Sequence, residues 1–236
     1  SDSMGVRDTG FIQLYCENNQ EAYDNTIMAV KIAEKSKLPV MVCYDGFITS
    51  HSVENIMLME NEEVKNFVGK YTPDEYLLDE KRNISMGPLA LQKDFYEKRY
   101  ELAKAMMDSK TIIKEVSEEF YNITGRKYDL FETYMLDDAE IGIVVLNSTA
   151  GTAKDAIDDL RKKGIKAGLL KPRVFRPLPW NEIALSLKGL KALAIMDKAD
   201  SINSYSGPLF CEITSSMYSS KVYVPCVNYI YGLGGV

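Results

Sequence analysis

The chain has 236 residues, a formal net charge of −6, 46% hydrophobic residues and 26% charged residues. These values are ordinary for a globular protein and allow one large domain or two small ones. The acidic balance argues against nucleic acid as the main partner, because phosphate binding needs clustered lysine and arginine. No apolar stretch reaches the roughly 18–20 residues that span a bilayer, and no signal peptide is visible. We therefore expect a cytoplasmic protein without a membrane partner.

The first part of the chain predicts a β-α-β unit. Residues 11–15 form a short apolar strand, and a helix from about Gln20 to Lys35 carries apolar residues at a period close to 3.6. Asn18 is placed to cap this helix, with Glu21 three residues on completing a capping box. Residues 38–44 are an apolar run, which we expect to be a parallel strand reached through a right-handed crossover.

That apolar run breaks abruptly into Asp45-Gly46-Phe47-Ile48-Thr49-Ser50-His51, which holds the only histidine of the chain. Open α/β sheets bind ligands in loops past the carboxyl ends of their strands. In one interpretation Gly46 permits a sharp turn, and Asp45, Thr49, Ser50 and His51 are available to a ligand or for hydrogen bonds that fix the loop. In the other, Asp45 caps backbone amides in a structural strand-to-loop transition. No catalytic triad is evident, so no catalytic residue and no metal site are assigned.

A polar, irregular stretch and a long helix follow. A short helix is predicted at Glu62–Phe67, and residues 72–91 are typical of an interdomain linker. The helix from about Lys93 to Ile123 would span roughly 45 Å and carries an apolar stripe. It is either a strut along one domain or a bridge across a domain or subunit interface.

From residue 128 onward the pattern predicts a second α/β domain with a mostly parallel sheet covered on both faces. The predicted strands are 141–146, 167–170, 192–196 and 222–227, and the predicted helices are 152–163, 180–187 and 209–218. Gly164 is expected to cap the first of these helices at its C-terminal end.

Two segments of this second domain are candidate anion sites. Ser148 and Thr149 lie in a small-residue turn that could cradle an anion on backbone amides, or could be an ordinary helix cap. Arg173 and Arg176 flank Phe175 in a predicted loop. They could dock a carboxylate or phosphate, or pair with acidic residues of the neighbouring domain.

The four cysteines form no Cys-x-x-Cys pair. Cys16 and Cys43 fall in or at the ends of predicted buried strands. We expect reduced cysteines in a core rather than a disulfide scaffold, a zinc site or an iron–sulfur site.

A series of motifs in chain order resembles the 2-oxoacid:ferredoxin oxidoreductase family, most closely the α subunit of pyruvate:ferredoxin oxidoreductase (pyruvate synthase). The motifs are Ser1-Asp2-Ser3-Met4, Arg7-Asp8-Thr9-Gly10-Phe11, Gln20-Glu21, the Asp45–His51 segment, Gly125-Arg126-Lys127-Tyr128, Asp138-Ala139-Glu140, Ser148-Thr149-Ala150-Gly151-Thr152, Phe175-Arg176-Pro177 and Tyr231-Gly232-Leu233-Gly234-Gly235. The resemblance covers essentially the whole chain. The chain departs from the family's pattern at Asn147, where a glycine is familiar, and at Leu178, where a second aromatic is familiar.

For the fold, the resemblance implies an α/β protein in three parts. Residues 1–68 would be the C-terminal portion of a thiamine-diphosphate pyrimidine-type domain, and 69–127 a linker with a long linking helix. Residues 128–236 would be a three-layer α/β/α domain similar to the transketolase C-terminal domain. Because the chain lacks a starting methionine and stops inside a glycine-rich turn, we expect an excised piece of a longer polypeptide.

For function, the resemblance implies oxidative decarboxylation of a 2-oxoacid with thiamine diphosphate and Mg²⁺, mostly bound by segments outside this chain. Electrons would pass through iron–sulfur clusters on other subunits or domains to ferredoxin or flavodoxin, and the acetyl group to coenzyme A. The isolated piece would be inactive, and a homo- or hetero-oligomer with the other subunits is expected. The alternatives are a non-catalytic assembly module and an enzyme for a branched-chain 2-oxoacid.

The resemblance also bears on individual residues. It places Asp2 and Arg7 near the cofactor or substrate. It favours Asp45, Gly46, Thr49 and His51 as organisers of a domain edge rather than as proton-transfer groups.

Overall fold

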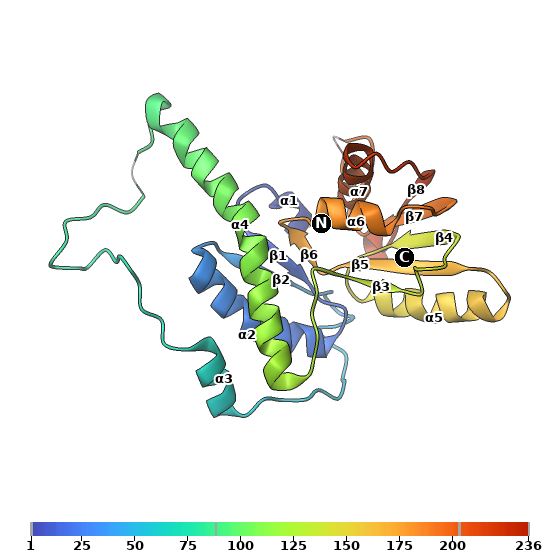
Figure 1. The fold of residues 1–236 in the computed structure, drawn as a ribbon, viewed down its shortest axis with the longest axis horizontal. Coiled ribbons are helices and arrows are strands. Elements are labelled where there is room, and N and C mark those ends of the chain that lie inside the picture. The colour runs from blue at the N-terminus through green and yellow to red at the C-terminus, as the bar shows by residue number, and fades with distance from the viewer. Residues whose placement is uncertain (1, 88, 203, 236) are drawn as a thin grey trace.

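The computed structural model describes residues 2–87, 89–202 and 204–235. Ser1, Pro88 and Val236, which belong to the predicted N-terminal loop, linker and C-terminal turn, lie outside the described residues. Two sheets, of order β2-β1-β6 and β3-β5-β4-β7-β8, lie side by side, and a long helix runs along the smaller one (Figure 1). The protein is therefore a mixed α/β structure with parallel strand pairs in both sheets.

The smaller sheet is built on the predicted β-α-β unit. A short helix α1 (Asp2–Gly5), predicted as loop, precedes β1 (Ile12–Tyr15), α2 (Asn19–Ser36) and β2 (Val40–Cys43). β1 and β2 pair in parallel from Ile12 opposite Val40 to Tyr15 opposite Cys43. The apolar face of α2 packs on Ile12 and Leu14, because a helix covers the sheet between the parallel strands that it connects.

The start of α2 confirms one half of the predicted capping box and corrects the other. The side chain of Asn18 accepts a hydrogen bond from the Glu21 amide at 2.9 Å, as expected of an N-cap. The Glu21 carboxylate, however, accepts from the amide of Glu17 at 2.7 Å, one residue before the cap. Glu21 thereby ties the end of the β1 loop to the helix.

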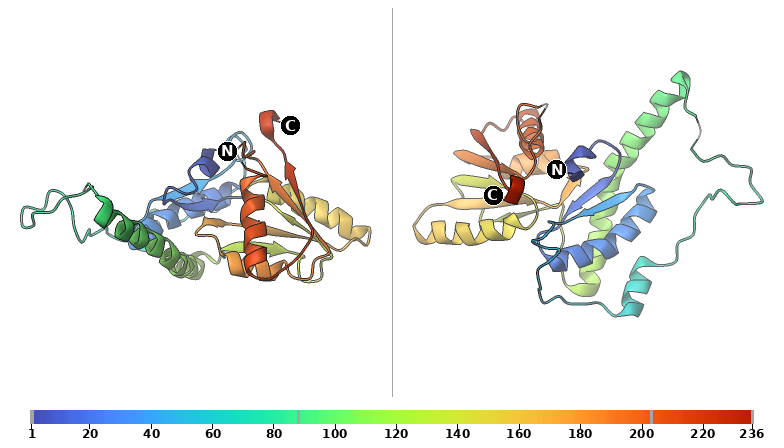
Figure 2. Two further views of the ribbon diagram at one scale, coloured as in Figure 1. Left: turned by 90° about the horizontal axis from the view of Figure 1, so that it is seen from above. Right: turned by 180° about the vertical axis from the view of Figure 1, so that it is seen from behind.

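Helix α3 (Asn61–Val68) leads into an irregular arm, residues 69–87 and 89–91, and then into α4 (Gln92–Thr124). The C-terminal half of α4 packs across α2 and buries Ile113, Val116 and Phe120. Its N-terminal end stands clear of both sheets, with the arm extending beyond it (Figures 1 and 2). Among the described helices, none combines the length and the apolarity that crossing a membrane requires.

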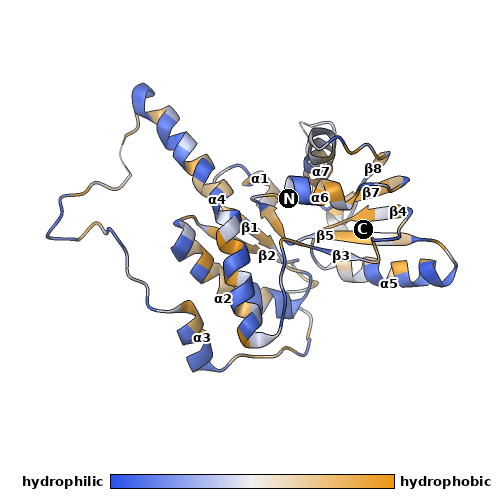
Figure 3. Ribbon diagram, viewed as in Figure 1, coloured by the Kyte–Doolittle hydropathy of each residue, from blue (hydrophilic) through white to orange (hydrophobic). Residues whose placement is uncertain are grey.

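The larger sheet has three parallel pairings and one antiparallel edge strand, β3. Its elements are β3 (Phe131–Tyr134), β4 (Ile141–Val144), α5 (Thr149–Lys162), β5 (Ala167–Pro172), α6 (Trp180–Ser186), β7 (Ala192–Asp197), α7 (Pro208–Ser219), β8 (Cys226–Ile230) and a 3₁₀ turn, η1 (Leu233–Gly235). Helix α5 covers one face, and α6 and α7 cover the other (Figure 1). The hydropathy colouring shows that the strands carry the most apolar stretches (Figure 3).

Several sequence-based boundaries in this half are corrected. Strand β3 was not predicted, because Phe131-Glu132-Thr133-Tyr134 alternates between apolar and polar residues over only four positions. β8 begins at Cys226 rather than at residue 222, because Pro225 has no amide hydrogen for the ladder. Gly164 follows the end of α5 with φ 78°, and the amide of Ile165 reaches back to the carbonyl of Leu160, as expected of the predicted glycine cap.

The predicted loop after β5 is instead a strand that joins the two sheets. After Pro172 the chain passes Arg173 and enters β6 (Val174–Arg176), which pairs antiparallel with β1 of the smaller sheet. The loop prediction was wrong because arginine is usually exposed to solvent, and Arg173 therefore favoured a surface loop. In the structure Arg173 is only 3% exposed and lies where the chain passes from one sheet to the other.

Arg173 is held by neutral oxygen atoms from three segments. Its guanidinium donates to Oδ1 of Asn25 at 2.7 Å, to Oγ of Ser117 at 2.9 Å and to the carbonyl of Asp129 at 2.6 Å. Burial lowers the pKa of Arg173 to about 10, so the side chain stays charged at neutral pH. One buried cation thus links α2, α4 and the segment that enters β3.

We expect Arg173→Met to lower the free energy of unfolding by about 3 kcal/mol, because it leaves several buried hydrogen-bonding groups unpaired. Urea denaturation followed by circular dichroism measures the change. Lys127→Met, at an exposed position, is the control and should change the free energy by less than about 0.5 kcal/mol. Equal effects of the two substitutions would contradict the role given to Arg173.

Candidate functional site

A cleft of about 550 Å³ opens where the carboxyl ends of parallel strands from both sheets meet. The ends of β1, β2 and β7 contribute to it, and α1 and the segment after β8 border it. Its lining residues are Asp2, Ser3, Met4, Tyr15, Met41, Val42, Cys43, Tyr44, Asp45, Gly46, Leu146, Asn147, Met196, Asp197, Lys198, Ala199, Tyr231 and Gly232. This is the edge at which α/β sheets bind ligands.

Asp45, a lining residue of this cleft, joins the loop after β2 to the larger sheet. Its carboxylate accepts from the amide of Ser148 at 2.9 Å, from the Ser148 hydroxyl, and from Nζ of Lys198 at 3.0 Å. Burial would raise the pKa of Asp45, but the Ser148 hydrogen bonds and the Lys198 ammonium outweigh it and hold the pKa below its usual range. The structure therefore brings together two loops that lie about a hundred residues apart in the chain.

Asn147 shows why this junction tolerates a residue other than glycine. It has φ 60°, in the left-handed region that glycine and asparagine adopt most readily. Its side-chain amide donates to Asp45 at 3.4 Å. The replacement of the familiar glycine thus keeps the backbone conformation and adds a contact to Asp45.

The end of β7 and the segment after β8 also line the cleft. The carboxylate of Asp197 accepts from the amides of Leu209 at 2.8 Å and Phe210 at 3.1 Å, at the start of α7. Burial raises the pKa of Asp197 despite these hydrogen bonds. A Cβ atom on Gly207 would lie 2.3 Å from this carboxylate, so the close approach requires glycine.

Tyr231 and Lys198 belong to this part of the lining. The hydroxyl of Tyr231 lies 2.8 Å from that of Thr149, and the Lys198 ammonium lies 5.7 Å from the centre of the Tyr231 ring. Neither Lys198 nor Tyr231 was singled out as a site residue from the sequence. The available signals were a charged pair, Asp197-Lys198, at the end of an apolar strand and the Tyr231-Gly232 motif.

Helix α1 borders the cleft on the side of the smaller sheet. The hydroxyls of Ser3 and Tyr15 lie 2.7 Å apart, and Nε2 of Gln13 donates to the Ser3 carbonyl at 2.7 Å. Burial raises the pKa of the Cys43 thiol beside them to about 11, so this thiol is protonated at neutral pH. The guanidinium of Arg7 donates to the carbonyl of Met4 at 2.8 Å and so fixes the end of α1.

The predicted site residues separate into two groups. Asp2, Asp45 and Gly46 line the cleft, whereas Arg7, Thr49 and His51 are not among its lining residues. Thr49 is buried within the loop, and His51 is exposed. The ring of His51 stacks on Phe47 at 4.9 Å, and its Nδ1 lies 2.7 Å from the Ser50 hydroxyl.

Gly46 lies in the turn, as one of the two interpretations expected, but the turn does not use the conformational freedom of glycine at this position. The left-handed residue of the loop is Phe47, with φ 66°, and a Cβ atom on Gly46 would meet no neighbour within 4 Å. The loop is instead closed by backbone and hydroxyl hydrogen bonds to Ser50.

The arginine candidates lie away from the cleft lining. Arg173 is in the crossing described above. Arg176 donates to the carboxylate of Glu212 and, at 3.1 Å, to the carbonyl of Arg7. It therefore ties β6 to α7 and to the segment after α1.

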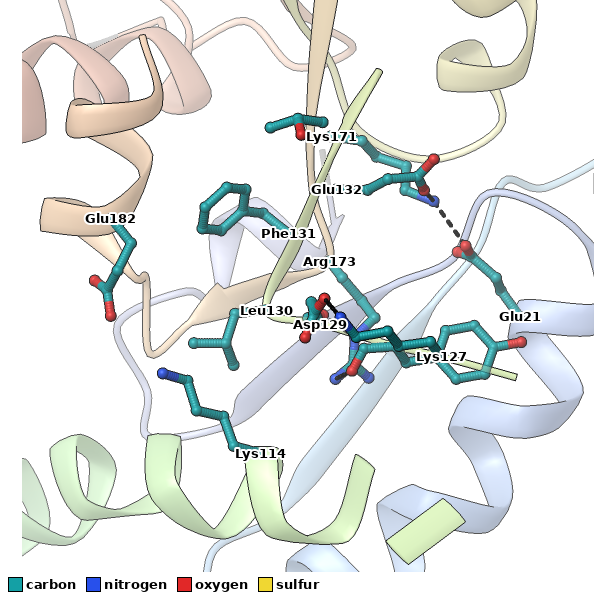
Figure 4. A pocket seen from close by; sticks show the side chains of 12 residues that line it. Glu21, Lys114, Lys127, Asp129, Leu130, Phe131, Glu132, Lys171, Arg173 and Glu182 are labelled. Atoms are coloured by element: carbon teal, nitrogen blue, oxygen red, sulfur yellow. Dashed lines mark hydrogen bonds and ion pairs between the residues drawn. The ribbon is translucent and has the colours of Figure 1, made fainter. Parts of the chain in front are cut away.

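A second cleft, of about 540 Å³, lies on the seam between α2, α4 and β3 (Figure 4). The ammonium of Lys171 lies 2.6 Å from a carboxylate oxygen of Glu21 and 2.7 Å from those of Glu17 and Glu132. These three carboxylates are close enough together to hold a metal ion. The Lys171 ammonium already takes the central position, so the cluster is a structural ion network.

Comparisons with known proteins place the chain in a family. A family profile described as pyruvate flavodoxin/ferredoxin oxidoreductase, thiamine diphosphate-binding, matches residues 1–118. A second profile, the pyruvate:ferredoxin oxidoreductase core domain II, matches residues 139–236. The chain belongs to the pyruvate:ferredoxin oxidoreductase family, within the 2-oxoacid:ferredoxin oxidoreductases, and it carries the α-subunit pattern of that family.

Curated relatives match over the full chain. Pyruvate synthase subunit PorA of Thermotoga maritima is 42% identical over 237 residues, covering 100% of this chain and 60% of the relative. PorA of Methanocaldococcus jannaschii is 42% identical, with 99% and 60% coverage. Ketoisovalerate oxidoreductase subunit VorA of Pyrococcus horikoshii is 39% identical, with 100% and 60% coverage. The chain thus spans about 60% of the length of these relatives.

A solved structure shares the fold. It is a 2-oxoglutarate:ferredoxin oxidoreductase from Magnetococcus marinus with 2-oxoglutarate, coenzyme A and succinyl-CoA bound. The TM-score is 0.60 at 14% identity, covering 94% of this chain and 39% of that one. At this identity the likeness supports the fold.

The contacts of Asp45 predict an acid-sensitive junction. Because its folded pKa lies below its unfolded value of about 3.9, it contributes stability above that value. The contribution is lost as the pH falls from about 5 through the folded pKa. We expect Asp45→Asn to flatten this part of the stability–pH curve, measured as urea midpoints from pH 7 to pH 3. Asp159→Asn, at a position with an exposed side chain, should leave the slope unchanged.

Proposed function

We propose that this chain is the larger part of the α subunit of a thiamine-diphosphate-dependent pyruvate:ferredoxin oxidoreductase that makes acetyl-CoA. The observation that carries the proposal is the 42% identity to pyruvate synthase subunits over the entire chain. The cleft at the carboxyl ends of both sheets supplies a place for the chemistry. Thiamine diphosphate, when bound, would stabilise the carbanion left by decarboxylation.

The cleft fits the ring of such a cofactor better than its diphosphate. Met41 and Met196 are among the lining residues, and methionine side chains pack well against aromatic rings. The oxygens of Asp45 and Asp197 are engaged by protein hydrogen bonds, and the Lys198 ammonium is held by Asp45. We infer that the groups binding the diphosphate and Mg²⁺ come from outside the described residues, as do the iron–sulfur clusters.

This proposal includes the domain assignment made from the sequence. Residues 1–68 would be the end of a pyrimidine-type domain, 69–127 the linker and linking helix, and 128–236 a transketolase C-terminal-like domain. The three layers around the larger sheet support the last assignment. Strand β6 belongs to residues 128–236 but pairs with β1, which belongs to residues 1–68. These two proposed domains are therefore joined by backbone hydrogen bonds within one sheet.

Two alternatives to a pyruvate-specific enzyme subunit are each supported by one observation. The VorA relative at 39% identity favours a branched-chain 2-oxoacid as the alternative substrate. The exposed end of α4 favours an assembly role, which is compatible with the enzymatic one. Ferredoxin or flavodoxin as the electron acceptor, the other subunits as partners and a cytoplasmic location belong to the same proposal.

The complete enzyme complex containing this chain should reduce viologen dye with pyruvate and coenzyme A. We expect kcat/KM for pyruvate to exceed that for 2-oxoisovalerate by about tenfold or more, because a pocket built for a methyl group rejects a branched chain. The isolated chain should show no dye reduction. Preference for the branched substrate would support the alternative enzyme, and inactivity of the complete complex with both would contradict the proposal.

Arg7 tests the position of the 2-oxoacid. A guanidinium binds a carboxylate through two parallel hydrogen bonds, and Arg7 lies just after the helix that borders the cleft. We expect Arg7→Ala in the complete complex to raise KM for pyruvate about tenfold or more. Lys188→Ala removes a positive charge at an exposed position and should leave KM unchanged. An unchanged KM in Arg7→Ala would remove Arg7 from the substrate site.

A further inference from the structure

Residues 3–8, which include the end of α1 and Arg7, are held by side chains from two paired strands. Gln13 on β1 and Arg176 on β6 are opposite each other in the ladder that joins these strands (Figure 1). Nε2 of Gln13 donates to the carbonyl of Ser3 at 2.7 Å, and Nε of Arg176 donates to the carbonyl of Arg7 at 3.1 Å. One cross-strand pair therefore fixes this segment near its start and near its end.

The guanidinium of Arg176 is itself held in one orientation. It lies over the ring of Phe175, 4.6 Å from the ring centre, and its Nη1 donates to the Phe175 carbonyl at 3.0 Å. Its Nη2 pairs with the carboxylate of Glu212 on α7 and lies 3.5 Å from that of Asp8. Because all three nitrogens of this planar group are engaged, Arg176 can fix the position of the Arg7 carbonyl to which it donates.

The backbone and the side chain of Arg7 are defined by separate contacts. Its carbonyl accepts from Arg176, whereas its guanidinium donates to the carbonyl of Met4, a lining residue of the cleft, at 2.8 Å. The Arg7 side chain is 33% exposed, so it remains accessible to a ligand. Recognition of a carboxylate by two parallel hydrogen bonds requires both the position and the direction of the guanidinium to be correct. A displacement of the backbone at residue 7 would change both.

The contacts of Arg176 argue against direct binding of a substrate carboxylate by this residue. Arg176 lies outside the described lining of the cleft, and its side chain is only 15% exposed. Its Nη2 already meets the carboxylates of Glu212 and Asp8. A further carboxylate would have to displace one of them, so Arg176 is better suited to support Arg7 than to replace it.

We propose that Arg176 is a positioning residue for the 2-oxoacid, because it fixes the backbone of Arg7 and so directs the Arg7 guanidinium toward the substrate carboxylate. This inference rests on the proposed function, in which Arg7 contacts the 2-oxoacid. It adds a residue from the second half of the chain to a site whose substrate arginine lies in the first. The antiparallel pairing of β6 with β1 is what brings the two residues together.

Arg176→Lys in the complete enzyme complex tests this role. Lysine keeps the positive charge beside Glu212 but lacks the planar fork that reaches Glu212 and the Arg7 carbonyl together. We expect KM for pyruvate to rise about fivefold with kcat within about twofold, because substrate binding is weakened and the chemical step does not use Arg176. The dissociation constant of oxamate, a pyruvate analogue that keeps the carboxylate, should rise by the same factor in isothermal titration calorimetry.

Arg161→Lys is the matched control for a purely structural loss. Arg161 donates to the carbonyl of Ala167 at 2.7 Å, pairs with Asp138 and has a side chain that is 19% exposed. Its contacts thus resemble those of Arg176 but lie at the start of β5, whereas the cleft lies at the carboxyl ends of strands. Both substitutions should lower the urea midpoint, and only Arg176→Lys should raise KM. Equal changes in KM would overturn the proposal.

A second variant leaves Arg176 in place. Glu212→Gln keeps the shape of the side chain but removes the negative charge that holds Nη2 of Arg176. We expect KM for pyruvate to rise about threefold with kcat within about twofold. Unchanged KM values in both Glu212→Gln and Arg176→Lys would show that Arg7 does not depend on Arg176.

The Arg7→Ala background separates this inference from the proposed function. With no guanidinium at residue 7 to direct, Arg176→Lys should raise KM by less than about twofold. The same fivefold rise in both backgrounds would overturn the positioning role and leave substrate binding by Arg7 intact. An unchanged KM in Arg7→Ala alone would overturn both roles, whereas the proposed function itself is contradicted only if the unsubstituted complex fails to reduce dye.

Discussion

The burial of one arginine at the passage of the chain between two sheets is the constraint on which the rest of this structure depends. Arg173 follows β5 of the larger sheet and precedes β6 of the smaller one, and its guanidinium is satisfied by Asn25 and Ser117. A buried cation is costly unless its hydrogen bonds are complete, so the elements that supply the acceptors are held in one arrangement. The two sheets cannot shift against each other without breaking this set.

The candidate site is a consequence of that arrangement. With the sheets fixed, the loop after β2 meets the loop after β4, and Asp45 reaches the amide of Ser148 and the ammonium of Lys198. The carboxyl ends of strands from both sheets then border a single cleft. The proposed chemistry of this cleft follows from membership of the pyruvate:ferredoxin oxidoreductase family. The groups that bind the cofactor's diphosphate, and the iron–sulfur clusters, are proposed to lie in other parts of the enzyme.

Helix α4 connects the cleft-bearing body to the proposed assembly surface. One of its apolar faces packs on α2 through Ile113 and Phe120, and the other is exposed around Tyr100. The two readings of this helix from the sequence, a strut or a bridge, are therefore not exclusive. Its C-terminal half is a strut in the structure, and the assembly role proposed for its exposed end would make its N-terminal half a bridge.

The order of most helices and strands was determined by the sequence itself, because periodicity and caps such as Asn18 and Gly164 act over a few residues. The family could also be identified from motifs in chain order. The course of β6, the burial of Arg173 and the meeting of Asp45 with Ser148 were decided only by the tertiary structure. Each depends on contacts between segments about a hundred or more residues apart. The local sequence around Arg173 predicts an exposed charge, whereas hydrogen bonds from distant segments allow this charge to be buried.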